Sequence, residues 1–424
     1  MTSSDNSGFE IRTVGVVGCG LMGSGIAQVC AQAGYPTTVR EVDKSTVEYG
    51  LARIDKFLAA GVKRKKLSRE AQEQTMAALF GTTELEDLSE CDLIIEAVVE
   101  DLEVKREVLI ELDGCVRRDA IFASNTSTLP ITGLAKNSKR PKNFIGIHFF
   151  SPVDKMMLTE IILGRKTSDK ALAVALDYVA AIKKTPIVVN DTRGFFVNRC
   201  VLRYMNESYN MLIEGVPPAM IENSARMAGM PVGPLSLNDE VAIDLSLKII
   251  RAAIADMGEK AVDPRHLELV ERMVEKEGRL GRKNGKGFYD YPAKPAKKHL
   301  WPELKTLYEQ QDADKIDVQE LKNRFLATIA LEAARTMEEG IVTDPREADI
   351  GTILGFGFAP HTGGALSYID EMGAAEFVAM CKSLQRKYGK QFKAPKLLVE
   401  MAEKGETFYG RFGAAESAAT KAAA

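Results

Sequence analysis

The sequence predicts an α/β fold, in which a doubly wound, mostly parallel sheet is followed by two related all-helical domains. Three observations lead to this prediction. Short apolar runs alternate with longer helical patterns through residue 190, the strand signal fades after Asp191, and two later helical stretches match each other in sequence. Alternating strands and helices are typical of a parallel sheet with helices on both faces.

The strands are predicted from short runs that are apolar and rich in β-branched residues. These runs cover residues 13–17, 37–39, 93–99, 121–124, 144–149 and 186–189. The pattern is helical from Phe195 to about Met273, and it is helical again from about Glu303 to Phe412. Residues 292–302, which include three prolines and three lysines, are predicted to be a linker between the two helical stretches.

The two helical stretches share residues at matching positions, which predicts an internal repeat. One constant offset along the chain, followed by a slightly larger one, aligns Asn198, Arg199, Glu207, Glu214, Gly215, Gly233, Leu235, Ser236 and Asp239 with Asn323, Arg324, Glu332, Glu339, Gly340, Gly364, Leu366, Ser367 and Asp370. The change of offset indicates a short insertion in the second copy. The predicted domains are therefore 1–192 for the sheet, 193–295 for the first helical copy and 296–412 for the second, with a disordered tail at 413–424.

The first predicted strand leads directly into a glycine-rich turn. The turn has the pattern Gly-x-Gly-x-x-Gly at Gly18, Gly20 and Gly23, with Leu21 and Met22 between the last two glycines, and a helical pattern follows. In this setting the first glycine allows a tight turn, the second lets a pyrophosphate approach the backbone, and the third lets the helix pack on the strand. The sequence therefore predicts a Rossmann-like dinucleotide site that includes these five residues.

The second predicted strand ends at Glu41, close to the spacing of roughly 20 residues after the glycine turn at which dinucleotide folds carry an acidic residue. A carboxylate at this position would accept hydrogen bonds from the adenine ribose and would repel a 2′-phosphate. The predicted cofactor is therefore NAD. Asp43 is the alternative carboxylate for this role, although the spacing favours Glu41.

Composition limits the other classes of function. The chain has 424 residues and a net charge of −3, a balance that predicts no nucleic-acid partner. No apolar run approaches the roughly 20 residues of a membrane span, and the segment from Met1 to Phe9 lacks the apolar core of a secretory signal. The six cysteines form no C-x-x-C pair, so we expect no metal site and a reducing, cytoplasmic location.

Further motifs make a family resemblance specific. They are Glu96-Ala97-Val98-Val99-Glu100, Lys105, Ser124-Asn125-Thr126-Ser127, His148-Phe149-Phe150-Ser151-Pro152, Glu160, Gly194-Phe195-Phe196-Val197-Asn198-Arg199 and Gly281-Arg282-Lys283-Asn284-Gly285-Lys286-Gly287-Phe288-Tyr289. In this order and spacing, from about residue 12 to 412, the chain resembles the 3-hydroxyacyl-CoA dehydrogenases. The doubled helical region looks like the dehydrogenase portion of multifunctional fatty-acid oxidation enzymes. Ser151 stands where single-function relatives usually carry Asn, whereas multifunctional relatives tend to have Ser.

The resemblance implies an activity and a set of roles. The activity is NAD-dependent oxidation of a (S)-3-hydroxyacyl-CoA to a 3-ketoacyl-CoA, in fatty-acid β-oxidation or related acyl-CoA metabolism. The resemblance makes His148 the general base and Glu160 its acidic partner, and it makes Ser127 and Asn198 the groups that bind the reacting oxygen. It also places three further residues at the cofactor, which are Glu100, Lys105 and Asn125.

The chemistry also needs a base, for which histidine is the natural choice. Alcohol oxidation removes a proton from oxygen and a hydride from carbon, and only a cofactor can accept the hydride. Histidine titrates near neutrality, and a nearby carboxylate fixes its tautomer and stabilises the imidazolium. His148 and Glu160 lie on two expected strand ends that flank a short loop, so a hairpin would bring them together.

A basic cluster at residues 63–66 is a candidate for binding coenzyme A. Lys63 and Lys66 flank two further basic residues at the end of a predicted helix. Coenzyme A carries a 3′-phosphate and a pyrophosphate, which suit a local cationic cluster. A solvated helix end without a ligand is the alternative.

Two other functions remain open from the sequence. A β-hydroxyacid dehydrogenase of the 3-hydroxyisobutyrate type shares the glycine-rich turn but would use a lysine in place of His148 with Glu160. A protein that binds NAD without turnover is the second alternative, because fold alone does not define function. Short relatives with one helical domain resemble proteins that dimerise through that domain. Here the second copy could supply the same contact within one chain, so the internal repeat predicts a monomer, with a homodimer as the alternative.

Overall fold

The structure is a computed structural model that describes residues 9–413, so the predicted tail beyond Gly413 lies outside the described residues. Contacts divide the chain into two compact units. The first contains residues up to Asn198 together with Glu339–Gly355, and the second contains Arg199–Glu338 together with residues from Phe356 onward. Among residues 9–413, no helix is long and apolar enough to span a membrane.

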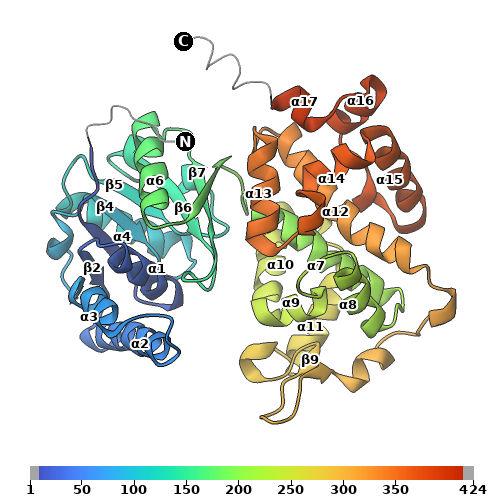
Figure 1. Cartoon of the computed structure of the whole chain (residues 1–424), viewed down its shortest axis with the longest axis horizontal. Helices are drawn as coiled ribbons and strands as arrows, with labels where there is room; N and C mark the ends of the chain where they lie inside the picture. The colour runs from blue at the N-terminus through green and yellow to red at the C-terminus, as the bar shows by residue number, and fades with distance from the viewer. Residues whose placement is uncertain (1–8, 414–424) are drawn as a thin grey trace. The chain divides into compact units, whose positions relative to one another are not determined.

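The first unit contains an eight-stranded sheet. The strands are β1 (Val14–Val17), β2 (Thr37–Arg40), β3 (Leu79–Thr82), β4 (Leu93–Glu96), β5 (Ile121–Ser124), β6 (Phe144–Phe149), β7 (Leu158–Leu163) and β8 (Thr185–Asn190). Strands β2, β4, β5, β6 and β7 of this sheet are labelled in Figure 1. Their order is β3-β2-β1-β4-β5-β6-β7-β8. Every neighbouring pair is parallel except β6 and β7, which are antiparallel. The predicted α/β class, with a mostly parallel sheet, is confirmed.

Three strand predictions need correction. The run at 93–99 was expected to be extended throughout, but β4 ends at Glu96. β3 was missed because it is a short edge strand in which only Leu79 is buried, so it has no apolar run. β7 lacked a predicted range and was expected only as a strand end near Glu160, although all its residues except the half-buried Leu163 are buried.

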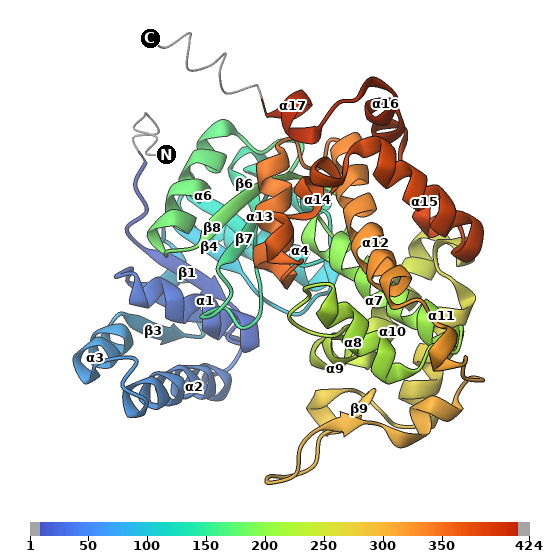
Figure 2. The same cartoon turned by 45° about the vertical axis from the view of Figure 1, so that its right-hand side comes forward.

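Helices cover both faces of this sheet. They are α1 (Leu21–Gln32), α2 (Lys44–Lys63), α3 (Arg69–Ala77), α4 (Leu102–Cys115), α5 (Ile131–Ala135) and α6 (Asp169–Ala181). Ile26 of α1 and Val174 of α6 share one apolar core with Val14 and Ile147 of the sheet. α2 and α3 pack against each other beside the β3 edge (Figure 2).

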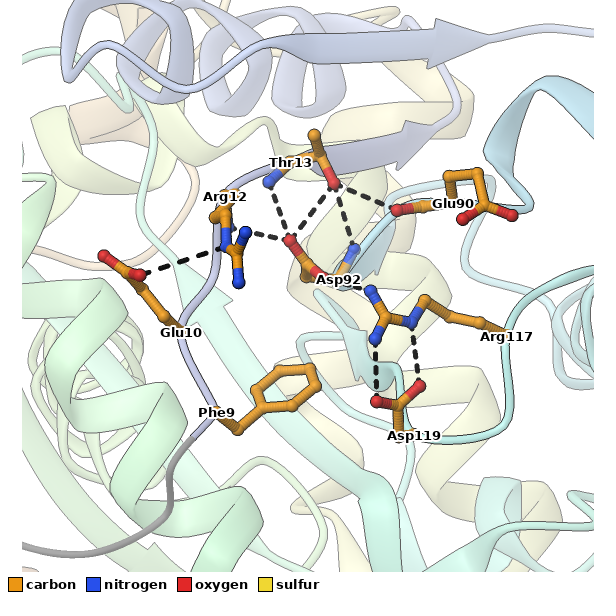
Figure 3. A pocket seen from close by; sticks show the side chains of 8 residues that line it. All are labelled: Phe9, Glu10, Arg12, Thr13, Glu90, Asp92, Arg117 and Asp119. Atoms are coloured by element: carbon orange, nitrogen blue, oxygen red, sulfur yellow. Dashed lines mark hydrogen bonds and ion pairs between the residues drawn. The ribbon is translucent and has the colours of Figure 1, made fainter.

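Polar contacts hold together the edge of the sheet at which β1 and β4 begin (Figure 3). One Asp92 oxygen accepts hydrogen bonds from the backbone of Arg12 and Thr13, and its other oxygen pairs with Arg117 at 2.6 Å. Arg117 also binds Asp119 with two hydrogen bonds of 2.8 Å. The hollow here, of about 360 Å³, is lined in part by Asp92, Arg117 and Asp119, whose charges are already paired with one another.

The second unit is mainly helical. Its helices are α7 (Val197–Ile213), α8 (Pro218–Met227), α9 (Pro234–Val241), α10 (Ile243–Met257), α11 (Pro264–Glu271), α12 (Val318–Glu338), α14 (Ala365–Met372), α15 (Ala374–Tyr388), α16 (Lys396–Lys404) and α17 (Phe408–Phe412). The first two residues of α7 belong to the first unit, as does all of α13 (Pro345–Phe356) except Phe356. A short antiparallel pair joins β9 (Tyr289–Asp290) to β10 (His299–Leu300). The expected linker at 292–302 thus includes a strand.

The two helical stretches repeat each other in local conformation. α14 and α15 begin and end at the positions that the second offset in the sequence predicts from the bounds of α9 and α10. The residue that joins each pair has a similar left-handed backbone, with φ of 83° at Ala242 and 87° at Gly373. Only glycine adopts this conformation without strain, so it is the first copy that departs from the favoured residue.

The same carboxylate contact also occurs in both copies. Asp239 accepts hydrogen bonds from the backbone N–H groups of Phe288 and Tyr289, at 2.7 and 2.8 Å. Asp370, its matched residue in the second copy, accepts from the N–H groups of a second Phe-Tyr pair, Phe408–Tyr409, at 2.8 and 3.0 Å. The matched aspartates therefore anchor equivalent Phe-Tyr segments.

Candidate active site

The candidate site lies where the carboxyl ends of the parallel strands meet, which is the usual ligand-binding edge of such sheets. The glycine turn follows β1, and Glu41 follows β2. Glu96 ends β4, Ser127 follows β5, and His148 lies near the end of β6. One edge therefore brings together the cofactor residues and the residues expected to do the chemistry.

The glycine turn has the geometry of a phosphate cradle. Gly18 has φ of +98°, which favours glycine, and a Cβ atom at Gly23 would lie 1.8 Å from the Gly18 carbonyl oxygen. A Cβ atom at Gly20 would meet nothing within 4 Å, so this face of the turn is open to a ligand. Leu21 and Met22 begin α1, whose N-terminal amides point toward the same space. The turn fits a dinucleotide pyrophosphate.

The two carboxylates that competed for the ribose role have different surroundings. One Glu41 oxygen accepts from the Cys19 N–H at 2.6 Å, which places this side chain at the glycine turn. Asp43 instead caps α2 by accepting from the N–H of Thr46 at 2.8 Å. Hydrogen bonds from Ser45 and Thr46 lower the pKa of Asp43 to about 2. The geometry favours Glu41 for the ribose.

Sequence reasoning missed Arg53, which also touches the glycine turn. Its guanidinium donates to the carbonyl oxygens of Cys19 and Gly20 at 2.9 and 2.5 Å and to the Ser24 hydroxyl at 2.6 Å. It thus places a positive charge beside the turn. A lone arginine within a helical pattern gives no signal for this contact, because the loop that it reaches lies much earlier in the chain, before β2.

Glu96 is a second residue that the sequence analysis left without a role. Lys105 donates to one Glu96 oxygen at 2.7 Å, and Ser124 donates to the other at 2.6 Å. The side chains of Glu96 and Lys105 are each only 1% exposed. The Lys105 ammonium also lies 3.3 Å from Glu100. Lys105 therefore joins two carboxylates inside the unit and does not present its charge at the surface.

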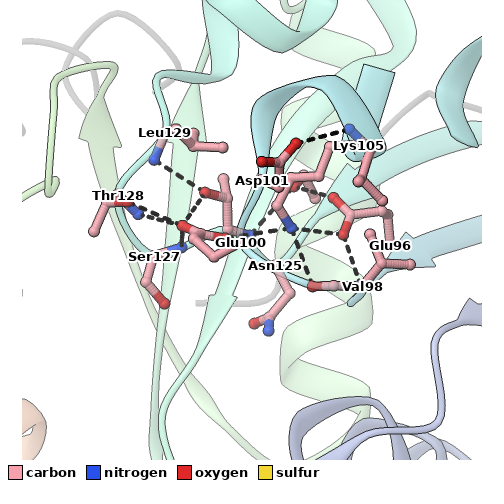
Figure 4. Close-up of polar contacts among 12 residues, drawn as sticks. Glu96, Val98, Glu100, Asp101, Lys105, Asn125, Ser127, Thr128 and Leu129 are labelled. Carbon is pink, nitrogen blue, oxygen red and sulfur yellow. Dashed lines mark hydrogen bonds and ion pairs between the residues drawn. The ribbon is translucent and has the colours of Figure 1, made fainter. Parts of the chain in front are cut away.

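Glu100 holds the loop that carries Ser127. One of its oxygens accepts from the N–H groups of Ser127 and Thr128 at 2.9 Å each (Figure 4). The same oxygen accepts from the Thr126 hydroxyl at 2.7 Å. Burial alone would raise the pKa of Glu100, but the Lys105 charge and these hydrogen bonds outweigh it, so the pKa is lowered. The carboxylate is therefore ionised at neutral pH.

Asn125, which follows β5, connects β4 and β6, the two strands on either side of β5, at the same edge. Its side-chain oxygen accepts from the N–H of Phe149 at 2.8 Å, and its own N–H donates to the Glu96 carbonyl oxygen at 2.8 Å. The residue is buried. In this structure its side chain fixes the end of β6, next to His148.

His148 and Glu160 are direct partners in the antiparallel register of β6 and β7. His148 Nδ1 lies 2.7 Å from Glu160 Oε2, and both side chains are buried. Since a carboxylate oxygen accepts, this contact favours the imidazole tautomer with its hydrogen on Nδ1, which leaves a lone pair on Nε2. The rings of Phe150 and Phe195 flank the imidazole, with centroids 4.5 and 5.7 Å away.

The second oxygen of Glu160 is held by the chain that leads into α7. It accepts from the N–H groups of Phe196 and Val197 at 3.1 and 2.9 Å. Gly194 and Phe195 immediately before them have φ of 72° and 53°. A bulky residue in this left-handed region is strained, as is common where function fixes the backbone. The strained turn points both amides at Glu160.

Ser127 and Asn198 complete the cluster. The Ser127 hydroxyl lies 3.1 Å from His148 Nε2, and the Asn198 amide donates to the Ser127 carbonyl oxygen at 3.0 Å. All four residues expected at the reaction site are therefore linked through hydrogen bonds. In contrast, Lys63 and Lys66 are exposed at the C-terminal end of α2. The 20-residue helix α2 starts just after Glu41, and its far end, which carries these lysines, is about 30 Å away from that start.

A glycine turn that fits a dinucleotide and a buried, carboxylate-oriented histidine lie at one edge of the sheet, which is the arrangement typical of NAD-dependent dehydrogenases. The family model for the NAD binding domain of 3-hydroxyacyl-CoA dehydrogenase matches residues 13–192, and the model for the C-terminal domain of this enzyme matches residues 194–291. The chain belongs to the 3-hydroxyacyl-CoA dehydrogenase family, and its cofactor is NAD. The resemblance seen in the sequence is thus confirmed.

Known relatives agree with this assignment. The chain is 39% identical over 408 residues to the fatty acid oxidation complex subunit alpha of Shewanella loihica, which covers 96% of this chain and 57% of that protein. It therefore spans little more than half of that relative. The (S)-3-hydroxybutyryl-CoA dehydrogenase of Ralstonia eutropha is 36% identical, with a TM-score of 0.62, over 67% of this chain and all of that one.

A third comparison concerns the fold alone. The crystal structure of 3-hydroxybutyryl-CoA dehydrogenase from Escherichia coli has a TM-score of 0.81 and 24% identity over 94% of this chain and 99% of that one. The two proteins therefore share a similar fold over nearly the whole of this chain. In residues 9–413, no group of three His, Cys, Asp or Glu side chains could hold a metal ion.

Proposed function

We propose that this protein oxidises the 3-hydroxyl of a (S)-3-hydroxyacyl-CoA to a ketone, using NAD, in fatty-acid β-oxidation or related acyl-CoA metabolism. The observation that carries the proposal is the hydrogen-bonded line from Glu160 through His148 to Ser127. It offers an oriented base next to a hydroxyl that marks where a substrate oxygen could bind.

The residues divide the work of the reaction. His148 Nε2 takes the proton of the substrate hydroxyl as the C–O bond becomes a carbonyl, and bound NAD supplies the acceptor for the hydride of the same carbon. Glu160 stabilises the imidazolium that forms. Ser127 donates to the reacting oxygen, while Asn198 fixes the Ser127 backbone. Burial keeps water from the proton transfer.

Other residues are proposed to bind the cofactor. The glycine turn with Leu21 and Met22 would hold the pyrophosphate, and Glu41 would hold the adenine ribose. Glu100 would face the nicotinamide side of the pocket, with Lys105 and Asn125 positioning that wall from inside. Lys63 and Lys66 would attract the phosphates of coenzyme A. We also retain the predicted cytoplasmic location as a proposal.

The test is a spectrophotometric assay of NADH oxidation with acetoacetyl-CoA, compared with longer 3-ketoacyl-CoAs. The parent protein should turn over at least one of these substrates, and the preferred chain length would define the substrate. His148→Ala should lower kcat by roughly 10²–10⁴, the usual range for general acid–base catalysis. Near-normal turnover in this variant would refute the mechanism.

Glu160→Gln separates the role of the carboxylate from that of the base. Loss of the negative charge beside the imidazole should lower kcat and move the acid limb of the pH profile to lower pH. A dehydrogenase with a lysine base, or a protein that binds NAD without turnover, would show neither effect. No observation specifically favours either of these alternatives.

A further inference from the structure

A segment from the second helical copy covers the open edge of the sheet in the first unit. β8 is the last strand, so its outer backbone groups have no strand partner. The Asn190 N–H donates to the Ile341 carbonyl oxygen at 2.8 Å, and the Asn190 side chain donates to the Gly340 carbonyl oxygen at 2.7 Å. The Val188 N–H donates to Glu347 at 3.2 Å. Residues 339–355 thus belong to the first unit, although they lie far from β8 along the chain.

Two glycines let α13 approach the chain that follows β8. A Cβ atom at Gly351 would lie 2.8 Å from side-chain atoms of both Ile187 and Phe196. A Cβ atom at Gly355 would lie 2.7 Å from Val197 Cγ1. The spacing of i and i+4 puts both glycines on the same face of the helix. These neighbouring atoms all belong to side chains, so a larger residue at either position would require those side chains to move.

The residues touched by these glycines are the ones that hold Glu160. Phe196 and Val197 donate their N–H groups to one Glu160 oxygen, and the other oxygen binds His148. The strained turn at Gly194 and Phe195 does not favour this arrangement by itself, so surrounding packing has to maintain it. α13 provides packing of this kind directly against both donors.

We infer that α13 is a positioning element for the catalytic pair, with Gly351 and Gly355 as its positioning residues. The inference rests on the proposed function, since it concerns the same His148–Glu160 pair. The second helical copy then has a role in catalysis: its helix α13 sets the backbone amides that orient the carboxylate. Gly351 and Gly355 would act through Phe196 and Val197 and not by direct contact with the substrate.

The experiment compares Gly355→Ala and Gly351→Ala with a matched control, Gly114→Ala. Gly114 lies in α4, and a Cβ atom there would meet nothing within 4 Å. Alanine favours helix more than glycine does, so neither substitution should weaken α13 itself. The α13 variants should lose roughly 10- to 100-fold in kcat, with a shifted pH profile and nearly unchanged affinity for NAD measured by fluorescence titration. The control should match the parent.

A double-mutant cycle keeps the test decisive if an α13 variant is poorly folded. The atoms closest to the Gly355 Cβ position include both Cγ atoms of Val197, and Val197→Ala removes them while keeping the N–H group. Gly355→Ala should therefore cost far less in the Val197→Ala background than in the parent. Full activity and a normal pH profile in Gly355→Ala, or an equal cost in both backgrounds, would overturn the inference. An inactive parent would instead count against the proposed function.

Discussion

At the scale of single residues, Glu160 is shared between two tasks. One oxygen fixes the tautomer of His148, and the other is held by two backbone amides, so the carboxylate has little freedom to turn. The sequence could predict this pair because a histidine and a glutamate on adjacent strand ends suggest a hairpin. The sequence could not predict the two backbone amides, because any residue at positions 196 and 197 other than proline has an N–H group to donate.

Other residues of the site divide in the same way. The glycine turn was predictable because each glycine meets a separate steric need. The buried Lys105–Glu96 pair was not predictable, because the sequence shows which residues are charged but not which of them are buried. Lys105 was expected to line the cofactor pocket, and its ammonium is instead enclosed by carboxylates.

Glu41 gives a prediction about cofactor choice. Its carboxylate lies at the glycine turn, where it would repel the 2′-phosphate of NADP. Parent enzyme should therefore have a much higher kcat/KM with NAD than with NADP, and Glu41→Ala should reduce this ratio. Asp43→Ala is the control and should leave the ratio unchanged. A parent preference for NADP would refute the assignment.

Glu347 gives a prediction about pH and stability. Burial, with a smaller contribution from the Asp344 charge, raises its pKa to about 7 against the opposing effects of the Val188 N–H and Arg346. Because the folded pKa is above the unfolded one, the contribution of Glu347 to stability is fully present below about pH 4.5 and is lost as pH rises through about 7.

The measurement uses Glu347→Gln, which keeps an oxygen for the Val188 N–H but does not ionise. Between pH 5 and pH 8 the parent should lose roughly 1–3 kcal/mol more unfolding free energy than the variant. Urea unfolding at both pH values measures the unfolding free energy of each protein. Subtracting the change in the variant from the change in the parent removes the contribution of the other titrating groups. Parallel pH dependence in the two proteins would show that Glu347 does not titrate in this range.

At the scale of elements, buried strands were easier to predict than edge strands. β1, β5 and β6 are buried along their length and mostly apolar, and the runs found in the sequence match them closely. β3 packs mainly through Leu79, so its hydrogen bonding to β2 depends on the neighbouring strand and not on its own composition. The hairpin of β9 and β10 was hidden for a similar reason, in a segment whose prolines and lysines suggested a linker.

The end of α2 gives a prediction about coenzyme A. Lys63 and Lys66 are exposed there, as a phosphate-binding cluster would have to be. Replacing both with Gln should raise KM for the acyl-CoA several-fold at low ionic strength, and the effect should shrink at high salt because charges are screened. Replacing the exposed Lys44 and Lys56 of the same helix is the charge-matched control. An unchanged KM would mean that the cluster faces solvent alone.

At the scale of the whole molecule, the helical repeat bears on assembly. We propose that the second copy takes the place of the partner that a single-copy chain would need, so that the protein is a monomer with one active site. Equivalent φ values at Ala242 and Gly373 and equivalent contacts of Asp239 and Asp370 support two copies of one structural unit. The second copy lacks the Gly-Phe-Phe before its Asn323, which supports a packing role.

Truncation after Pro295 tests this proposal. It removes the second copy together with residues 339–355, which cover β8. The shortened protein should dimerise, aggregate or lose activity, because apolar surface and an unpaired strand edge become exposed. Light scattering and the acetoacetyl-CoA assay should be run on both forms. A truncated protein that is monomeric, soluble and fully active would contradict the proposed role of the repeat.

The cover over β8 also has a consequence for synthesis on the ribosome. Val188 and its partner Glu347 are 159 residues apart, so the sheet emerges long before the segment that completes its edge. At a typical rate of about 5–20 residues per second, the nascent chain spends roughly 8–30 s with β8 uncovered. A bare strand edge can pair with other chains during that time. Cells that make this protein should therefore depend on chaperones, or on slow initiation that keeps nascent chains apart, to limit aggregation.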